Sequence, residues 1–432
     1  MVISLVAIAL SVLLYHKLRN QSLKKVLLIL SSLYVYYQFV GWYISFLMLI
    51  AVITCICSKQ LVVHPNKHST IMSTFIVVIC LGFLFLKYAS PHSIQLPVGF
   101  SIYAFSCISL LIDQSRGEAK LSFLDILFYL CFFPKILSGP IERSANFVNQ
   151  LKNDGREDVF SNLYKSFKVI IFALFCKFVI ADRLGVYISD NYCGPNQFIN
   201  ALIFAIQFYL DFWAYSNLAI GFGLIYGIQL SANFQSPYSA HSFKDFWKKW
   251  NITLSSWLRD YVYIPLKGNK VSTIQWCFNV VVVFMVSAIW HGMFMPFIIW
   301  GFLHALLLII ETRLSSNAMF SFVCKSRFYP IIVFACCAIL WQTFRYENVQ
   351  GLELFLCRLV TWEKINISII LVFIISVIVM LTLQSSRIEE LMFNMQQNHL
   401  FIISEVILIS IMGLSILLFG LNFNSPFFYF NF

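Results

Sequence analysis

The chain has 432 residues, of which 60% are hydrophobic and only 11% are charged, with 45 phenylalanines. Ordinary soluble domains carry roughly 25% charged residues, so this composition excludes a soluble protein and predicts an all-α polytopic membrane protein. The formal net charge is +11, from 30 Lys and Arg against 19 Asp and Glu. Basic residues in short loops are typical of the cytoplasmic side of membrane proteins, so this excess requires no nucleic-acid partner.

Apolar stretches recur along the whole chain, and about 20 such residues span a hydrocarbon core of ~30 Å. The first, residues 2–16, lacks a preceding basic region and a following cleavage site, so we interpret it as a transmembrane helix and not as a signal peptide. Several later stretches are too short or too broken to span alone. We therefore expect about eleven spanning helices, give or take two, in a single membrane domain covering residues 1–432.

The run 123–138 differs from the other apolar stretches because Pro134, Gly139 and Pro140 interrupt any helix there. Irregular backbone at membrane depth is tolerated only where it is buried in protein or lines a cavity. The sequence therefore predicts a re-entrant segment. Glu142 and Arg143 follow this break, and either a structural or a functional role is open for them.

Twelve cysteines occur singly or inside apolar runs, as in "ITCICSK" and "FACCAIL". A metal site would require spaced pairs with His or carboxylate neighbours. We interpret the cysteines as small packed hydrophobes and predict neither a metal site nor a disulfide framework.

Residues 242–270, "SFKDFWKKWNITLSSWLRDYVYIPLKGNK", are predicted to form a basic interfacial helix. Apolar side chains share one side of a helical wheel: Phe243, Trp247, Trp250, Leu254 and Leu258. Polar and basic side chains lie beside them: Lys244, Lys248, Asn251, Ser255 and Arg259. A surface anchor with no further role is the simpler interpretation of this segment taken alone.

Polar side chains within apolar stretches are costly in a membrane, so each is a hypothesis of function. The segment 198–230 contains four of them: Gln207, Asp211, Tyr215 and Asn217. Asp211 and Tyr215 are four residues apart and share a helix face, but hydrogen bonding between helices would explain this row as well as catalysis. In "CKFVIADRL", Lys177 is expected to snorkel to the interface and Asp182 to pair with Arg183.

Two histidines lie in the apolar stretch "SAIWHGMFMPFIIWGFLHALLL", at positions 291 and 304. Gly292 and Pro296 predict a break that leaves His291 at the end of one helix and His304 inside the next. A neutral imidazole beside irregular backbone can accept a proton from an attacking hydroxyl near neutral pH, as acyl transfer requires. No Gly-x-Ser-x-Gly motif accompanies it, so direct attack by an acceptor hydroxyl is the simplest chemistry. For His304, structure and chemistry are both open.

An ordered set of motifs resembles the membrane-bound O-acyltransferase (MBOAT) family, above all its bacterial alginate O-acetyltransferase-like branch. The strings are "PVGFSIYAFSCISLLIDQSRGE", "FPKILSGPIERSANF", "KFVIADRL", "YLDFWAYSNLAIGFGLIYGIQLSANFQSPY", "FWKKWNITLSSWLRDYVYIPLKGN" and "AIWHGMFMPFIIWGFLHALLL". The likeness covers roughly residues 80–315 as an MBOAT-like core. "LWQTFRYEN" and the closing "FFYFNF" also look like that branch.

The resemblance implies an acyl-transfer pore in a bundle of tilted helices, with His291 and Asn251 as facing catalytic residues. Members of the bacterial branch usually have His where this chain has Asn251, while many animal members have Asn. Because an amide can orient a carbonyl but cannot act as a base, the proton chemistry falls on His291. Supporting or substrate-binding roles extend to other candidates: His304, Asp211, Tyr215, Ser255, Arg259, Glu142 and Arg143. In "LDFWAYSN", Trp213, Ala214 and Asn217 depart from the "DFSGYSD" of relatives, which leaves the acceptor open.

By the same resemblance we expect an O-acetyltransferase of the bacterial inner (cytoplasmic) membrane. It would move an acetyl group from a cytoplasmic thioester toward hydroxyls of a cell-surface or exported polysaccharide, through an extracytoplasmic acetyltransferase or esterase-like partner protein. No tightly bound cofactor is expected, and acetyl-CoA or another acyl thioester would be the co-substrate. The alternatives are D-alanyl transfer to teichoic acid from a carrier protein, or a proton-coupled transporter or flippase.

Overall fold

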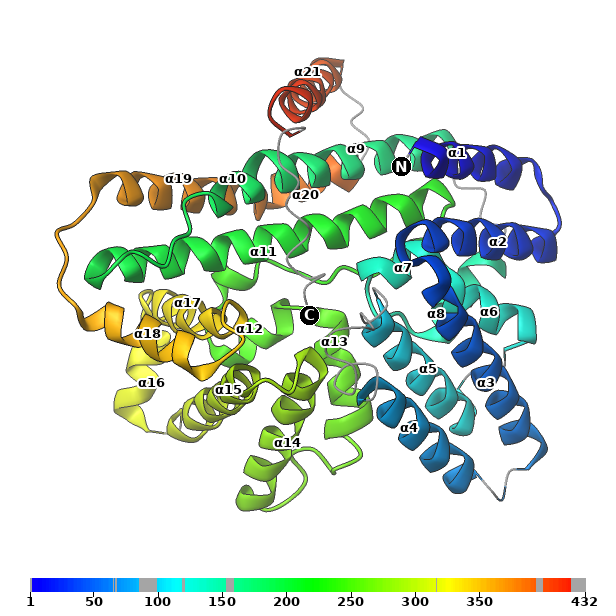
Figure 1. The fold of residues 1–432 in the computed structure, drawn as a ribbon, viewed down its shortest axis with the longest axis horizontal. Helices are drawn as coiled ribbons and strands as arrows, with labels where there is room; N and C mark the ends of the chain where they lie inside the picture. Colours follow the sequence, from blue (N-terminus) through cyan, green and yellow to red (C-terminus); the bar gives the residue numbers. More distant parts are fainter. Residues whose placement is uncertain are drawn as a thin grey trace. The chain divides into compact units, whose positions relative to one another are not determined.

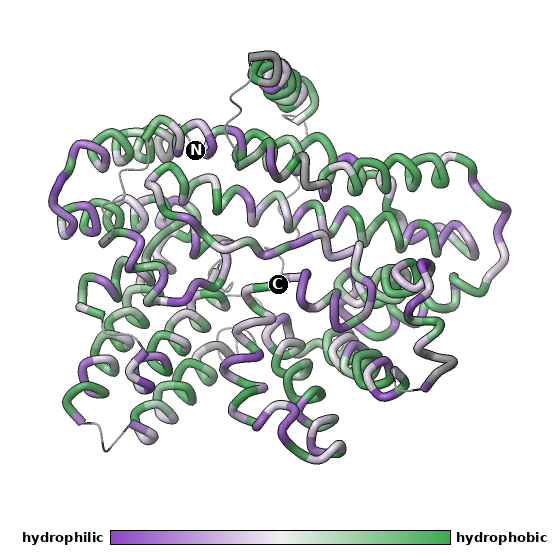
Figure 2. Tube along the Cα trace, turned by 180° about the vertical axis from the view of Figure 1, so that it is seen from behind, coloured by the Kyte–Doolittle hydropathy of each residue, from purple (hydrophilic) through white to green (hydrophobic). Residues whose placement is uncertain are grey.

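The computed structural model describes residues 2–64, 66, 68–84, 99–118, 121–152, 159–315, 317–393 and 399–420. The polar stretch 149–162, "NQLKNDGREDVFSN", which its mixed charges predict to be a solvated cytoplasmic connection, lies partly outside these residues. The closing "FFYFNF" lies wholly outside them. Helix is the only regular secondary structure in the described part of the chain, which confirms the all-α prediction. Figure 1 shows the helices, and Figure 2 shows hydrophobic residues along most of their length.

Contacts divide the chain into two compact units, the first made of residues 1–167 and 218–231. Its helices are α1 (Val2–Lys17), α2 (Gln21–Val40), α3 (Ile44–Val63), α4 (His68–Leu84), α5 (Phe100–Ser115), α6 (Phe123–Cys131), α7 (Phe133–Ser138), α8 (Ser144–Lys152) and the first half of α9 (Val159–Phe175). The predicted re-entrant segment consists of α6 and α7, which are separated at Phe132 by extended backbone. Pro134 lies in the first turn of α7, where its missing N–H costs no helical hydrogen bond.

The second unit comprises residues 168–217 and 232–432. After the end of α9, a π-helical turn spans Cys176–Ala181. The helices that follow are α10 (Asp182–Gly185), α11 (Gly194–Ile225, shared with the first unit), α12 (Phe243–Lys249), α13 (Ile252–Leu258), α14 (Thr273–His291), α15 (Met295–Leu314), α16 (Ala318–Lys325), α17 (Tyr329–Leu340), α18 (Val349–Val360), α19 (Ile367–Leu383), α20 (Ser386–Phe393) and α21 (His399–Ser415).

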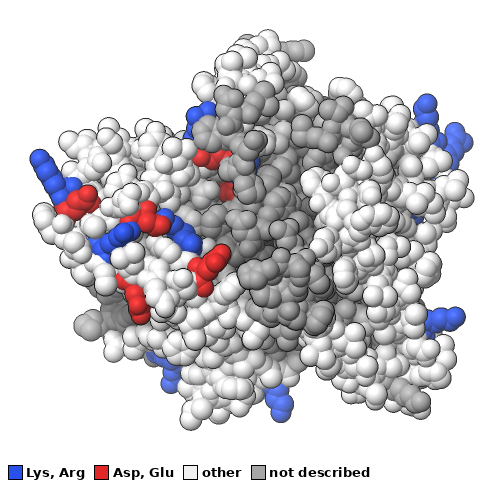
Figure 3. Space-filling view, viewed as in Figure 1, with Lys and Arg blue, Asp and Glu red and all other residues white. Residues whose placement is uncertain are grey.

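Within the described residues, five helical stretches are long and apolar enough to cross a membrane: Gln21–Val63, Gly194–Ile225, Thr273–His291, Met295–Leu314 and Ile402–Gly420. Five shorter apolar helices accompany them, and the count of about eleven spans stays a prediction. On the face drawn in Figure 3, most of the described surface is uncharged, and acidic and basic side chains gather mainly at the left and at the edges.

Close packing of α14 against α15 fixes the part of the second unit that holds both histidines (Figure 1). Gly301 makes this approach possible, because a Cβ added there would lie 2.8 Å from the carbonyl oxygen of Phe284 and 2.9 Å from Cβ of Ala288. Small residues allow helix backbones to approach closely in membrane proteins. The histidines are therefore set on a rigid helix pair.

Candidate active site

His291 is the last residue of α14, and α15 begins at Met295, so the predicted break after His291 is confirmed. The N–H of Gly292 donates to the carbonyl of Ala288 at 2.9 Å and closes the helix. A Cβ at Gly292 would lie 2.7 Å from the ring of Phe297, so a larger residue would fit this turn only if that ring moved. The irregular backbone beside His291 thus results from residues close to it in the sequence.

Aromatic rings surround the imidazole of His291, which is 7% exposed. Trp300 meets it edge to face at a centroid distance of 5.3 Å, and Phe344 does so at 5.0 Å. The neighbouring Trp290 lies at 4.5 Å. These contacts restrict the orientation of the His291 ring.

Asn251 lies at a break that the sequence did not predict. The expected continuous helix from 242 is wrong: α12 ends at Lys249, α13 begins at Ile252, and a π-helical turn follows at Arg259–Tyr263. Asn251 adopts a left-handed backbone conformation, with φ 40° and ψ 58°, which asparagine tolerates better than most residues. Asn251 is buried, with 6% of its surface exposed.

Backbone hydrogen bonds from the preceding segment hold this break open. The N–H of Ile252 donates to the carbonyl of Asn233 at 2.8 Å, and the N–H of Gln235 donates to the carbonyl of Lys249 at 3.0 Å. The hydroxyl of Thr253 adds a bond to Oδ1 of Asn233 at 2.6 Å. The amide of Asn251 is therefore presented from a fixed loop and not from a helix face.

One aromatic cluster connects the neighbourhoods of Asn251 and His291. Trp250 contacts Trp341 at 4.6 Å, and Trp341 contacts Trp300 at 5.8 Å. Trp300 in turn meets His291. Two motifs 40 residues apart in sequence therefore share one packed core.

His304 lies within the same cluster and is completely buried. Its ring contacts Trp247 at 4.9 Å and Trp300 at 5.3 Å, and it stacks on Phe246 and Phe284. Neither ring nitrogen has a hydrogen-bond partner among the described residues. Because aromatic rings enclose it, the imidazole of His304 contributes to this cluster through van der Waals packing.

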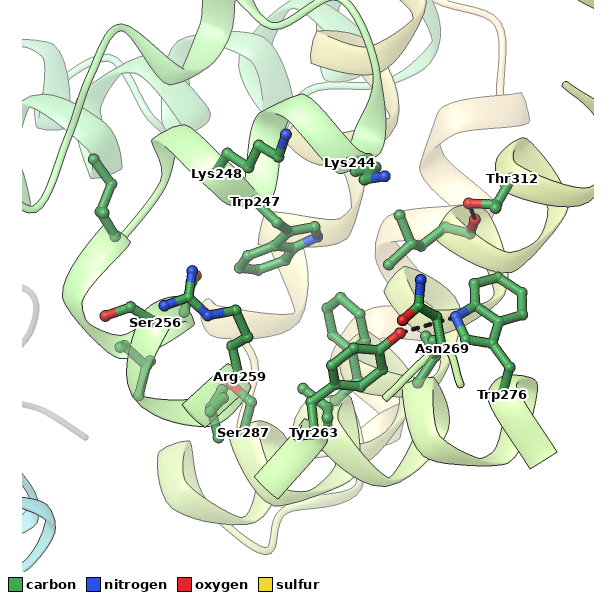
Figure 4. A pocket seen from close by; sticks show the side chains of 18 of the residues that line it. Lys244, Trp247, Lys248, Ser256, Arg259, Tyr263, Asn269, Trp276, Ser287 and Thr312 are labelled. Atoms are coloured by element: carbon green, nitrogen blue, oxygen red, sulfur yellow. Dashed lines mark hydrogen bonds between the residues drawn. The ribbon is translucent and has the colours of Figure 1, made fainter. Parts of the chain in front are cut away.

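A pocket of about 650 Å³, which we call the basic pocket, opens between α12, α13, α14 and α15 (Figure 4). Four cationic side chains line it: Lys244, Lys248, Arg259 and Arg313. Hydroxyl groups and aromatic rings complete the lining: Ser255, Ser256, Ser287, Thr273, Thr312, Tyr263, Trp247, Trp276 and Phe284. Of these, the sequence indicated Ser255 and Arg259 as site residues.

Neither His291 nor Asn251 lines the basic pocket, but two serines that do line it each lie four residues from one of them. Ser287 precedes His291 by four residues on α14 and therefore shares its helix face. Ser255 follows Asn251 by four residues, and its N–H donates to the carbonyl of Asn251 at 2.9 Å. The spacing of Ser287 from His291 was the sequence signal that could have revealed this pocket.

Asp211 belongs to a buried ionic cluster with Lys177 and Asp182. Nζ of Lys177 lies 2.6 Å from Oδ1 of Asp211 and 2.7 Å from Oδ1 of Asp182, and all three side chains are 2% exposed. The expectation that Lys177 snorkels and that Asp182 pairs with Arg183 is wrong. Arg183 instead donates to the carbonyl of Phe419 at 2.8 Å. Tyr215, one turn beyond Asp211, is buried as well.

Glu142 and Arg143 lie in the first unit, in the loop after α7. Oε1 of Glu142 accepts the N–H of Ser231 at 2.5 Å, and Oε2 accepts its hydroxyl at 3.1 Å. Burial raises the pKa of Glu142 above its ordinary value, against the lowering effect of the Ser231 hydrogen bonds. Glu142 therefore fastens its own loop to the irregular segment after α11.

Sequence comparison places this architecture in a known class. The family model for membrane-bound O-acyltransferases (MBOAT) matches residues 100–345. The chain belongs to this family, and it is a multi-pass membrane protein.

Individual relatives include three kinds of envelope-modifying protein. The chain is 34% identical over 264 residues to a probable alginate O-acetylase, AlgI, of Pseudomonas aeruginosa, covering 60% of this chain and 50% of that protein. It is 34% identical over 251 residues to a peptidoglycan O-acetyltransferase of Helicobacter pylori, covering 56% and 48%. It is 30% identical over 235 residues to a teichoic acid D-alanyltransferase of Bacillus subtilis, covering 50% and 59%. The chain thus spans about half the length of these relatives.

Proposed function

We propose that this protein is a membrane O-acetyltransferase of the bacterial inner membrane. It takes an acetyl group from a cytoplasmic thioester, acetyl-CoA, and passes it toward hydroxyls of a cell-surface or exported polysaccharide. The observation that carries the proposal is the basic pocket, whose serines 255 and 287 each lie four residues from a catalytic candidate. The alginate and peptidoglycan O-acetylases among the relatives support an acetyl group and a glycan acceptor.

The donor would bind in the basic pocket with its phosphates against the cations. Lys244, Lys248 and Arg259 come from the segment predicted to lie at the cytoplasmic interface, and Arg313 lies at the end of α15. Clustered cations attract a polyanionic donor, and the apolar rings below them suit the pantetheine arm. The thioester would then reach the layer of Ser255 and Ser287.

His291 would act as general base in the transfer. The acceptor hydroxyl attacks the thioester carbonyl carbon while His291 takes the hydroxyl proton. Asn251 donates its amide N–H to the carbonyl oxygen, on which negative charge develops. The C–S bond breaks, and the departing thiolate receives the proton from His291. The attacking hydroxyl would belong to an extracytoplasmic partner protein of the acetyltransferase or esterase-like kind. A glycan hydroxyl would then attack the ester formed on the partner, which takes the acetyl group and releases the partner's hydroxyl.

Transfer of label from acetyl-CoA to host polysaccharide in membranes tests this function. We expect His291→Ala to lower transfer at least about 100-fold, the usual contribution of a general base. His64→Ala, at an exposed histidine after α3, serves as control and should match the wild type. Undiminished transfer by His291→Ala would exclude His291 as the base.

The same assay separates the alternative functions. A D-alanyltransferase would label the acceptor from a D-alanyl carrier protein and not from acetyl-CoA, as the teichoic acid relatives suggest. A transporter or flippase would move its substrate with no covalent label on the polysaccharide. Either result would replace the acetyl-transfer proposal.

A further inference from the structure

Trp247 forms an internal wall of the basic pocket. It comes from α12, between the pocket cations Lys244 and Lys248. In Figure 4 its indole extends across the pocket, below Lys248 and above Arg259 and Tyr263. A molecule that enters past the cations therefore meets this ring.

Away from the pocket, Trp247 is packed against three rings. His304 contacts the indole at 4.9 Å, Phe284 at 5.2 Å and Trp300 at 5.8 Å. His304 and Trp300 are 0% and 1% exposed. Close-packed interiors resist displacement, so the indole is a rigid surface for a bound ligand.

The packing behind Trp247 continues to the catalytic base. Trp300 contacts both His304 and His291, each at 5.3 Å. A bulky group that displaced Trp247 would push on Trp300 and disturb the orientation of His291. For its carbonyl to be within reach of His291, a bound thioester must place its acyl group on the side of the pocket that faces Trp247. The packed rings therefore limit the space for the acyl group on that side.

We propose that Trp247 determines acyl-chain length, restricting the donor to a two-carbon acyl group, and that His304 is a positioning residue that holds Trp247 in place. The inference rests on the proposed acyl-transfer function and specifies its donor. Each methylene that a pocket wall accepts or rejects changes the relative rate by about 10- to 200-fold, so a rigid indole is sufficient for this selection.

The test compares transfer from acetyl-CoA and butyryl-CoA to the same polysaccharide in membranes. The wild type should strongly prefer acetyl-CoA. Trp247→Ala should raise the ratio of butyryl to acetyl transfer at least about tenfold by opening the wall. His304→Ala should raise this ratio less, because the Trp247 indole is still present but can move into the space left by the imidazole. Trp247→Leu keeps an apolar side chain and should act in the same direction if Trp247→Ala folds poorly.

Trp276→Ala is the matched control, because Trp276 lines the same pocket but its indole N–H bonds to the Tyr263 hydroxyl at 3.1 Å. It should leave the butyryl-to-acetyl ratio unchanged. Equal ratios in wild type, Trp247→Ala and Trp247→Leu, or an equal shift in Trp276→Ala, would overturn the inference while the proposed function stands. A wild type that transfers neither acyl group would overturn both.

Discussion

The rings of Trp300 and His291 meet at a centroid distance of 5.3 Å with an interplanar angle of 89°. Edge-to-face pairs of this kind contribute about 0.5–1.5 kcal/mol beyond the area they bury. Trp300 lies on α15 and His291 on α14, so the pair depends on the close approach of the two helices at Gly301.

Gly301→Ala should therefore affect both stability and transfer. Its Cβ would clash with backbone of α14, and overpacking of this kind costs about 1–3 kcal/mol. Thermal unfolding in detergent and acetyl transfer measure the two effects. Gly413→Ala in α21 meets nothing within 4 Å and should be neutral or slightly stabilising. Equal unfolding temperatures for the two variants would contradict the packing argument.

Substitutions at Asn251 can separate the effect of its left-handed backbone conformation from the effect of its side-chain amide. Asn251→Gly keeps the left-handed backbone at no steric cost, so its stability should stay near the wild-type value while acetyl transfer falls. Asn251→Ala should lose transfer and in addition about 1 kcal/mol of stability from backbone strain. Wild-type transfer by Asn251→Gly would show that the amide has no role in the reaction.

Lys177 is expected to be essential for stability. Lys177→Met would leave Asp182 and Asp211 buried without their cation, and breaking such a cluster costs about 3–5 kcal/mol. Its unfolding temperature in detergent should fall sharply. The triple change Lys177→Met, Asp182→Asn and Asp211→Asn should recover part of the loss. A single variant as stable as the wild type would refute the assignment.

Glu142 should make stability depend on pH. Because burial raises the pKa in the folded state, folding favours the protonated acid. The stabilising contribution of Glu142 to folding is fully present below its pKa in the unfolded chain, about 4.5. This contribution is lost as the pH rises through the higher pKa of Glu142 in the folded protein. Unfolding temperatures measured from pH 4 to 8 should thus fall relative to those of Glu142→Gln. Parallel curves for the two proteins would argue against a raised pKa.

Lys248 and Arg259 should act on donor binding and not on the chemical step. Lys248→Gln and Arg259→Gln remove cations from the basic pocket, so KM for acetyl-CoA should rise several-fold while kcat changes little. Added salt should raise the wild-type KM toward that of the variants, because it screens exposed charges. The control is Lys59→Gln, at an exposed lysine of α3. An unchanged KM would place the donor elsewhere.

Features that depend on local chain chemistry could be predicted from the sequence. Apolar stretches of spanning length predicted the all-helical membrane protein, because hydrocarbon requires internally satisfied backbone hydrogen bonds. Gly292 and Pro296 predicted the break after His291, because their own backbones disfavour a continuous helix. Periodicity alone failed at Asn251, where "KKWNITLS" contains neither glycine nor proline.

Features that require segments distant in the chain to meet could not be predicted in this way and depend on the folded structure. The helix breaks at Asn251 because the backbone groups of Asn233 and Gln235 form hydrogen bonds with Ile252 and Lys249. A continuous helix would use the same N–H and carbonyl groups for its own hydrogen bonds. Lys177 is buried because Asp211, 34 residues further on, folds back to pair with it. The basic pocket likewise combines α12 and α13 with α14 and α15. Side-chain spacing encodes which face a residue occupies, but only the packing of helices decides which faces meet.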